Sequence, residues 1–315
     1  MRLKSALRRG VAAAVIAGIV VSSGIPVYAK TWDIASGDIT VKGASDESGN
    51  YNEVKQGDKG FEKDEGETVI TGKSKEHTVT IDTSKGNVDV TFDDLKIDVS
   101  GKAEVDGSGK AEGDVSDKTE VDGSDKAEVD GGGDSPVRES NAAVTVKGDH
   151  DATIELDGKN ELKSGSKNAG LEKNDERSED GKTISGKLTI KDDKGKDGSL
   201  TAAGGAGAGI GGKHESGAGN IEITGGTIKA EGGEGAAGIG GGVYGIGHDI
   251  EISGGKVSAT GGNANKNLES FRTGAAGIGD GAGTEKDEID PNAPSNPNHI
   301  YISGDAEVEA KAGAS

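Results

Sequence analysis

A glycine-rich unit that recurs at a fixed spacing is the feature of this sequence that most constrains its fold. Residues 220–233 (NIEITGGTIKAEGG) return 29 positions later as residues 249–262 (DIEISGGKVSATGG). A shorter signature, Ala-Gly-Ile-Gly-Gly, alternates with this unit at residues 208–212 and 237–241. Self-similarity at a period of this size is typical of solenoids, in which each repeat packs on its neighbours.

Each repeat predicts three short strands. In residues 221–224 isoleucines alternate with polar residues, so the apolar side chains share one face of a strand. The glycines at 225–226 turn the chain, Ile228 and Ala230 point inward from a second strand, and Ile239 does so from a third. Such a coil buries these residues only by stacking on its neighbours. The repeats therefore predict an all-β fold, a single parallel β-helix of roughly five to six coils.

The earlier part of the chain follows the same alternation less regularly. Apolar pairs such as Val79 and Ile81 are typical of strands, and they follow a predicted capping region around residues 32–70. We therefore expect an N-terminal cap with the first β-helix strands at residues 30–99. The β-helix repeats are expected to occupy residues 141–315.

An acidic low-complexity insertion, residues 100–140, separates these two parts. Within residues 102–133 an octapeptide beginning with Lys occurs four times, which gives four Lys against ten acidic residues. A tract with so few apolar residues cannot build a core, so we predict a solvated, disordered loop at one edge of the helix. A calcium-chelating tract is the alternative interpretation.

The composition excludes several classes of protein. With 30% hydrophobic residues, 3% aromatic residues and 57 Gly, the chain lacks the side chains of a helical bundle or a large aliphatic α/β enzyme. The absence of Cys excludes a disulfide scaffold and a cysteine-based zinc site. A formal net charge of −20 repels nucleic acid and anionic lipid, so neither is an expected partner.

Residues 1–29 have the pattern of a secretory signal peptide. Four basic side chains precede an apolar run at residues 11–21, which is too short to span a bilayer, and residues 27–29 offer a small-x-small cleavage site. We predict a secreted protein, extracellular or held non-covalently at the cell wall, with no transmembrane helix after cleavage. A retained N-terminal anchor is the alternative. The pattern stops in mid-repeat at residue 315, so we also expect a fragment of a longer chain whose exposed last strands favour end-to-end self-association.

Residues 31–34 (TWDI), together with the paired Ile-x-Ile-x-Gly-Gly and Ala-Gly-Ile-Gly-Gly repeats, carry a resemblance to a known family. The chain resembles secreted or surface proteins of Gram-positive, often gut-dwelling, bacteria that are labelled carbohydrate-binding domain proteins. The resemblance covers most of residues 31–315 apart from the acidic insertion. It implies a right-handed parallel β-helix shaped like the pectate-lyase solenoids, binding of polysaccharides such as acidic plant polymers, bound calcium and no established catalysis. The resemblance assigns no functional residues to these motifs.

One short segment suggests a metal site. Residues 192–198 (DDKGKDG) look like a calcium loop, in which Asp193 and Asp197 supply carboxylate oxygens. The middle ligand position is Gly195 and the distal bidentate Glu is missing, so a tight polar turn is the alternative. Calcium is the only cofactor that the sequence suggests.

The segments that follow each Gly-Ile-Gly predict a binding edge. Because successive coils stack, we expect residues 213–217, 243–248 and 282–298 to emerge from the same edge, and loops on one side of a solenoid are its usual binding face. The stack brings together aromatic, histidine and acidic side chains, namely His214, Tyr244, His248, Asp280, Glu285, Asp287 and Asp290. A sugar ring that stacks on Tyr244 is the functional interpretation. Variable loops without a ligand are the alternative.

We therefore predict a secreted or cell-surface, non-catalytic protein that binds polysaccharide, with possible assistance from calcium. The first alternative is a structural adhesin or spacer whose repeats supply length and stiffness alone. The second is a calcium-dependent polysaccharide lyase, which would need an Arg or Lys as the base. Outside the predicted signal peptide the chain holds only three arginines, Arg138, Arg177 and Arg272, so the sequence gives this reading little support.

Overall fold

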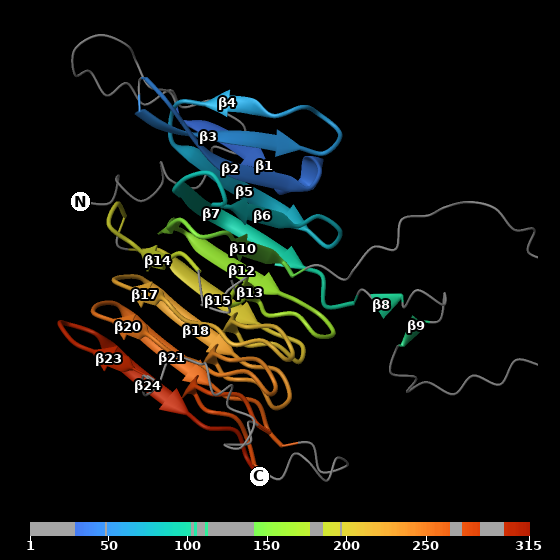
Figure 1. The fold of residues 1–315 in the computed structure, drawn as a ribbon, viewed down its shortest axis with the longest axis vertical. Helices are drawn as coiled ribbons and strands as arrows, with labels where there is room; N and C mark the ends of the chain where they lie inside the picture. The colour runs from blue at the N-terminus through green and yellow to red at the C-terminus, as the bar shows by residue number, and fades with distance from the viewer. Residues whose placement is uncertain are drawn as a thin grey trace, which may run out of the picture.

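The computed structural model describes residues 29–47, 49–101, 104–105, 111–112, 142–176, 185–195, 197–264, 273–283 and 299–315. These residues form a long stack of strands whose axis runs from the N-terminal to the C-terminal part of the chain (Figure 1). The described part contains one 3-10 helix, η1 (Ile34–Ser36), and is otherwise β-structure and turns. The predicted all-β parallel β-helix is confirmed.

Each coil contributes one strand to each of three faces, and the strands on a face pair in parallel with those of the next coil. The first face contains β2 (Ile39–Asp46), β6 (Val79–Asp82), β10 (Val144–Lys147), β13 (Leu171–Lys173), β16 (Ile210–Gly211), β19 (Ile239–Gly240) and β22 (Ile278–Gly279). The second face contains β7 (Val88–Asp98), β11 (Ala152–Asp157), β14 (Leu188–Lys191), β17 (Ile221–Ile223), β20 (Ile250–Ile252) and β23 (Ile300–Ile302). The third face contains β12 (Lys159–Lys163), β15 (Ser199–Ala203), β18 (Thr227–Glu231), β21 (Lys256–Thr260) and β24 (Glu307–Lys311).

Strand β7 belongs to two faces at once. It has 11 residues, and its backbone turns at Asp94, whose φ is 50°. The residues before this point pair with β11 and those after it pair with β12. The third face is therefore the path β7-β12-β15-β18-β21-β24, whose six strands match the predicted number of coils. Strand β5 (Thr68–Ser74) pairs in parallel with both parts of β7, so β2 and β5 form one further turn before these coils.

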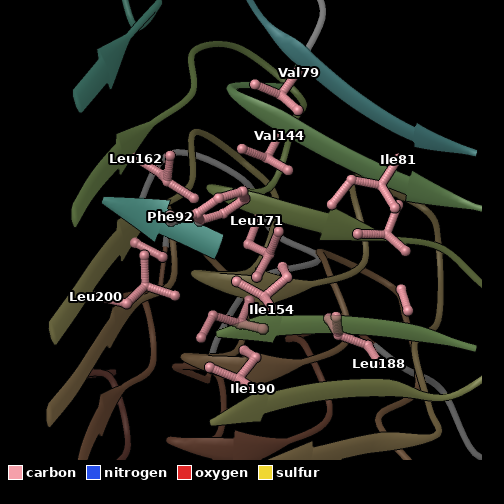
Figure 2. Packing of buried hydrophobic residues seen from close by; sticks show 14 of the residues in the cluster. Val79, Ile81, Phe92, Val144, Ile154, Leu162, Leu171, Leu188, Ile190 and Leu200 are labelled. Atoms are coloured by element: carbon pink, nitrogen blue, oxygen red, sulfur yellow. The ribbon is translucent and has the colours of Figure 1, made fainter. Parts of the chain in front are cut away.

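The core runs through the centre of the coils. In one coil Val144 of β10, Ile154 of β11 and Leu162 of β12 all point inward and are buried (Figure 2). The predicted period sets the register between coils, because Ile221 pairs with Ile250 across β17 and β20. Full burial of one such aliphatic side chain contributes about 1.5–3 kcal/mol relative to leaving it exposed.

The Ala-Gly-Ile-Gly-Gly signature has a steric cause. Gly211, Gly240 and Gly279 stack on one another with φ values of 135°, 130° and 125°, a backbone conformation that side chains disfavour. A Cβ atom on Gly211 would lie 2.1 Å from the carbonyl oxygen of Gly240, and one on Gly240 equally close to that of Gly279. The corner therefore admits only glycine in successive coils.

The N-terminal part departs from the repeat. Strand β2 pairs in antiparallel fashion with β3 (Gly49–Gln56), and β3 does so with β4 (Glu62–Asp64), while β1 (Lys30–Asp33) pairs in parallel with β5 (Thr68–Ser74). Trp32 is buried here, and its indole N–H donates to Asp64 Oδ2 at 3.0 Å. Strands β3 and β4 therefore continue the first face beyond β2 and form a wall at the N-terminal end of the stack (Figure 1).

The acidic insertion is described only in part. Its β8 (Glu104–Val105) and β9 (Ala111–Glu112) form a short antiparallel pair. The other residues between 102 and 141, and the predicted signal peptide apart from residue 29, lie outside the described residues. A disordered insertion and a cleaved leader therefore stay predictions.

Candidate functional site

The structure brings the predicted edge loops together. The Glu215 N–H donates to the Val243 carbonyl at 2.7 Å, and the Tyr244 N–H donates to the Ala282 carbonyl at 3.0 Å. The rings of His214 and Tyr244 meet edge to face, with centroids 5.9 Å apart, and Tyr244 is 39% exposed. Loops from successive coils thus lie side by side, with one tyrosine accessible to solvent.

His248 and Asp280, two of the predicted ligand-binding residues, make internal contacts instead. His248 Nε2 lies 2.9 Å from Asp175 Oδ2, and its Nδ1 lies 3.0 Å from Asp249 Oδ2. The hydrogen bond with Asp175 raises the pKa of His248 to about 9, because it outweighs the desolvation that opposes the charge. Asp280 Oδ1 accepts from the Gly247 N–H at 3.0 Å. These two side chains hold the loop edge together.

The remaining predicted acidic ligands, Glu285, Asp287 and Asp290, lie outside the described residues. The structure therefore places only part of the proposed edge. Tyr244 is the described side chain there with both an aromatic face and substantial exposure.

The predicted calcium loop is a polar turn in which Asp193 has a cationic partner. Its carboxylate lies 2.9 Å from Lys191 Nζ, and its backbone N–H donates to Glu155 Oε1 at 2.8 Å. Asp197 is exposed nearby. The pKa of Asp157 is raised mainly by the burial of Asp157 itself and next by the negative charge of Asp197. Among the described residues no three His, Asp or Glu side chains are grouped to hold a metal ion. Calcium binding at Asp193 and Asp197 stays a prediction.

A cleft that the sequence did not predict lies where the N-terminal wall meets the second face. Its volume is about 420 Å³. We call it the hairpin cleft and define it by its lining residues, which are Asn50, Tyr51, Asn52, Glu65, Gly66, Glu67, Asn87, Asp89, Val90, Thr91, Thr153, Glu155, Lys191 and Lys194. Strand β3 and the segment after β4 form one side, β7 and β11 form the floor, and the end of β14 forms the far rim. Most of its lining side chains are amides, hydroxyls, carboxylates or ammonium groups.

Asn52 fixes the wall to the floor. Its side-chain amide donates to Thr68 Oγ1 at 2.9 Å and to the Asp89 carbonyl at 2.7 Å. The adjacent Tyr51 is half-buried, and Lys63 Nζ lies 4.3 Å from the centroid of its ring. The tyrosine is therefore held in place on the wall by a cation–π contact and by the anchored strand.

Glu155 lies on the floor of the cleft and is 4% exposed. Its Oε1 accepts from the backbone N–H groups of Asp193 and Lys194, each at 2.8 Å. Its Oε2 is buried, lies 3.6 Å from Lys191 Nζ and has no hydrogen-bond partner among the described residues. A buried carboxylate oxygen in this state is ready to accept a hydrogen bond.

Glu67 and Lys194 form an ion pair across the rim. The Thr91 hydroxyl also donates to Glu67, at 2.6 Å. Burial opposes ionisation of Glu67, but the hydrogen bonds from Lys194 and Thr91 outweigh it, so the pKa of this carboxyl lies below its ordinary value. The cleft therefore presents an ionised carboxylate and an ammonium group side by side.

This cleft was not predicted from the sequence, because the cap expected around residues 32–70 was given no binding role. The contacts that build the cleft join residues far apart in the chain, such as Asn52 with Asp89 and Glu155 with Lys194. The one usable signal was an aromatic residue between two amides at positions 50–52.

Comparison with known proteins supports the architecture. A family model described as a beta helix repeat matches residues 221–243 and 250–282, the two most regular coils. The two matched segments are similar to β-helix repeats, in agreement with the parallel pairing of their strands in the structure. No curated protein and no solved structure matches the chain. In the described residues we find no helix with the length and apolar character of a membrane span.

Proposed function

We propose that the protein is a secreted or cell-surface, non-catalytic polysaccharide-binding protein and that the hairpin cleft is its binding site. The observation that carries the proposal is a cleft of about 420 Å³ that is lined mostly by amides, hydroxyls and charged groups and has Tyr51 among its lining residues. Sugar hydroxyls both donate and accept hydrogen bonds, and the apolar face of a sugar ring packs on aromatic side chains.

The charge states in the cleft favour binding over catalysis. A glycoside hydrolase needs a carboxylic acid whose pKa is raised, whereas the pKa of Glu67 is lowered. A lyase needs a basic group that is neutral at working pH, whereas the hydrogen bond to Asp193 raises the pKa of Lys191. Burial does lower the pKa of Lys173 to about 8, but this side chain is buried and donates to the Gly219 carbonyl away from the cleft.

Calcium enters the proposal as an aid to binding. Carboxylate oxygens are the ligands that calcium prefers, and Glu65, Glu67, Asp89 and Glu155 line the cleft. No three of the described acidic side chains are grouped to hold an ion by themselves, so calcium in the cleft would need further oxygens from the ligand. An acidic sugar would share such an ion with the protein. The titration below therefore includes an arm with calcium and an arm with chelator.

Calorimetric titration of the full chain against neutral and acidic polysaccharides tests the proposal. We expect saturable heat with at least one polymer and no ultraviolet-absorbing unsaturated product. Tyr51→Ala should weaken binding at least about tenfold, which corresponds to the loss of one aromatic contact. Lys194→Gln, an exposed change at the opposite rim, should weaken binding by a smaller factor.

Tyr244→Ala is the matched control, because it removes the exposed tyrosine of the predicted loop edge. Unchanged binding by this variant would locate the ligand in the hairpin cleft, and a loss confined to Tyr244→Ala would locate it at the loop edge. Thermal unfolding of each variant separates lost binding from lost structure. A folded sample that gives no heat with any polymer would contradict polysaccharide binding and leave the spacer or adhesin as the function. Formation of unsaturated product would establish the lyase.

We further propose end-to-end self-association through the last described coil, which favours the spacer or adhesin as a second candidate. Ile300 and Ile302 occupy the core positions of Ile250 and Ile252, yet they are 38% and 54% exposed because no described strand covers them. Light scattering across a concentration series should show dimers of the full chain. Ile302→Lys should abolish them. A monomer at every concentration would contradict this proposal.

A further inference from the structure

Four lysines converge on a groove of about 250 Å³ on the third face of the helix. We call it the lysine groove. It is lined by Lys73, Ser74, Lys75, Lys96, Ile97, Asp98, Glu161 and Lys163, which come from β5 and the position after it, from the second half of β7 and from β12. A cationic groove on a chain with a formal net charge of −20 is unexpected on composition alone.

The register places like charges next to one another. Lys73 pairs with Lys96 across β5 and β7, and neighbouring parallel strands lie about 4.8 Å apart. Like charges at directly opposed positions destabilise a sheet. Lys96 finds one compensating carboxylate, Glu161, whose Oε1 lies 2.5 Å from its Nζ.

The other three lysines of the groove have no ion-pair partner in the described part of the chain. Further along the same face, Lys229 lies 2.8 Å from Glu231 and Lys256 lies 3.9 Å from Glu307, whereas Lys159 and Lys311 have no ion-pair partner in the part of the chain that the structure describes. Unlike these separate lysines, the four lysines of the groove line one hollow together with two carboxylates. The groove therefore concentrates positive charge at one place on the face.

The two carboxylates of the groove respond to this charge. The hydrogen bond from Lys96, followed by the charges of Lys96, Lys163 and Lys73, lowers the pKa of Glu161. The pKa of Asp98 is lowered first by the hydrogen bond from Ser100, with contributions from Lys163 and Lys75. Both carboxylates are thus ionised, and four lysines against two carboxylates leave the groove cationic.

We propose that the lysine groove is a second binding site, for a glycan that carries sulfate or phosphate groups. The lysines supply point charges, and lysine binds phosphate groups in proteins in this way. Adjacent lysines on successive strands suit a polymer whose anionic groups recur along its length.

This site is distinct from the hairpin cleft. The two share no lining residue, and they use opposite ends of β7, on either side of the turn at Asp94. Binding at the groove and binding at the cleft are therefore separable by mutation, and failure of one proposal leaves the other standing.

Dextran and dextran sulfate, which share a backbone and differ in their sulfate groups, provide the direct test. We expect the full chain to bind dextran sulfate with saturation and to ignore dextran. The affinity should fall steeply as salt rises from about 0.05 M to about 0.5 M, because screening weakens exposed charge pairs. Poly(glycerol phosphate) in a parallel arm establishes whether phosphate groups bind at the same place.

The variant Lys73→Glu/Lys163→Glu should weaken binding of dextran sulfate at least about tenfold, as expected for loss of charge-assisted contacts. Lys229→Glu/Lys256→Glu makes the same change of charge on the same face outside the groove, and it should bind like the parent chain. Thermal unfolding checks that both variants are folded.

Several outcomes would overturn the proposal. Equal losses of affinity in the two double variants would show that binding depends on the overall charge of the chain rather than on the groove. Tighter binding of oligogalacturonate than of dextran sulfate would assign the groove to carboxylates. Tighter binding of a DNA oligonucleotide than of dextran sulfate would assign the groove to nucleic acid. If neither anionic polymer bound, the groove would not be a binding site.

Discussion

The regular coils from residue 188 onward and the irregular first part of the helix share one architecture but use it differently. In the regular coils the third-face core position is aliphatic in every turn, as Leu200, Ile228 and Val257. In the coil before them the same position is Asn160. The regular coils build a uniform rod, whereas the places that break the pattern carry buried polar groups and clefts. The lysine groove lies in the irregular part, and so does the hairpin cleft apart from Lys191 and Lys194 on its far rim.

The largest effect is expected at a corner glycine of the regular coils. Gly240→Ala should lower the free energy of unfolding by about 3–5 kcal/mol, because the new Cβ both strains a positive φ and meets the Gly279 carbonyl. Urea unfolding followed by circular dichroism measures the change. Gly60→Ala in the irregular part is the control and should be nearly neutral, since nothing lies within 4 Å of its Cβ position. Similar losses in both variants would contradict the stacking argument.

A second prediction concerns the polar position that breaks the aliphatic ladder. Asn160 is 1% exposed, accepts from the Leu95 N–H at 2.9 Å, and donates to the carbonyls of Asp157 and Ser199 at 3.0 and 3.1 Å. Asn160→Leu should therefore reduce the free energy of unfolding by about 2–3 kcal/mol, although leucine fits the later coils.

Ile228→Leu changes the same register position within the regular coils and is the matched control for Asn160→Leu. Its expected effect is below about 1.5 kcal/mol, because the substitution conserves volume. A stable Asn160→Leu protein would show that the irregular coils tolerate the regular pattern and that the asparagine has no structural role.

The third and smallest effect concerns the loop edge, where Asp175 of the irregular part meets His248 of the regular coils. Because the pKa of His248 is raised from 6.5 to about 9, the folded protein keeps a proton that the unfolded chain releases. The stabilisation is fully present below pH 6.5 and is lost as pH rises through 9. Between pH 6.5 and 8 we expect a loss of about 1–2 kcal/mol.

Urea unfolding at pH 6.0, 6.5, 7.0, 7.5 and 8.0 measures this slope, and Asp175→Asn should flatten it. The pH range of the measurement ends at 8 because the titration of Lys173 changes the slope above that value. Burial lowers the pKa of Lys173 to about 8, so above that pH its folded form is neutral while the unfolded chain is still protonated, and stability then rises with pH. An equal slope in the parent chain and Asp175→Asn would exclude the His248–Asp175 pair as its source.

The coil could be predicted from the sequence because its information is local and repeated. Ile221 and Ile223 alternate with polar residues, and their copies 29 positions later confirm the register. The corner glycines are equally clear in the sequence, but their close approach to a carbonyl of the next coil could not be predicted from it. The inward residues predicted from this pattern are buried in the structure.

The candidate site was much less predictable, because it depends on pairs of residues distant in sequence. The sequence predicts His248 as a ligand-binding loop residue, yet the structure pairs it with Asp175, which lies 73 positions away. Asp193 looked like a calcium ligand, but the structure pairs it with Lys191, and Glu155 holds its backbone. Neither contact recurs with the repeat, so the periodicity that predicts the fold does not predict these contacts.

The constant register of the regular coils has an evolutionary consequence. Since Ile221, Ile250 and Ile300 fall on one line while the chain between them varies in length, the stack tolerates both exact copies and copies with longer loops. Duplication of one unit would lengthen the rod by about 4.8 Å and would create no contact that is not already present. Selection could thus change the reach of this protein by unequal recombination within its own gene, while the two proposed sites at its N-terminal end stay untouched.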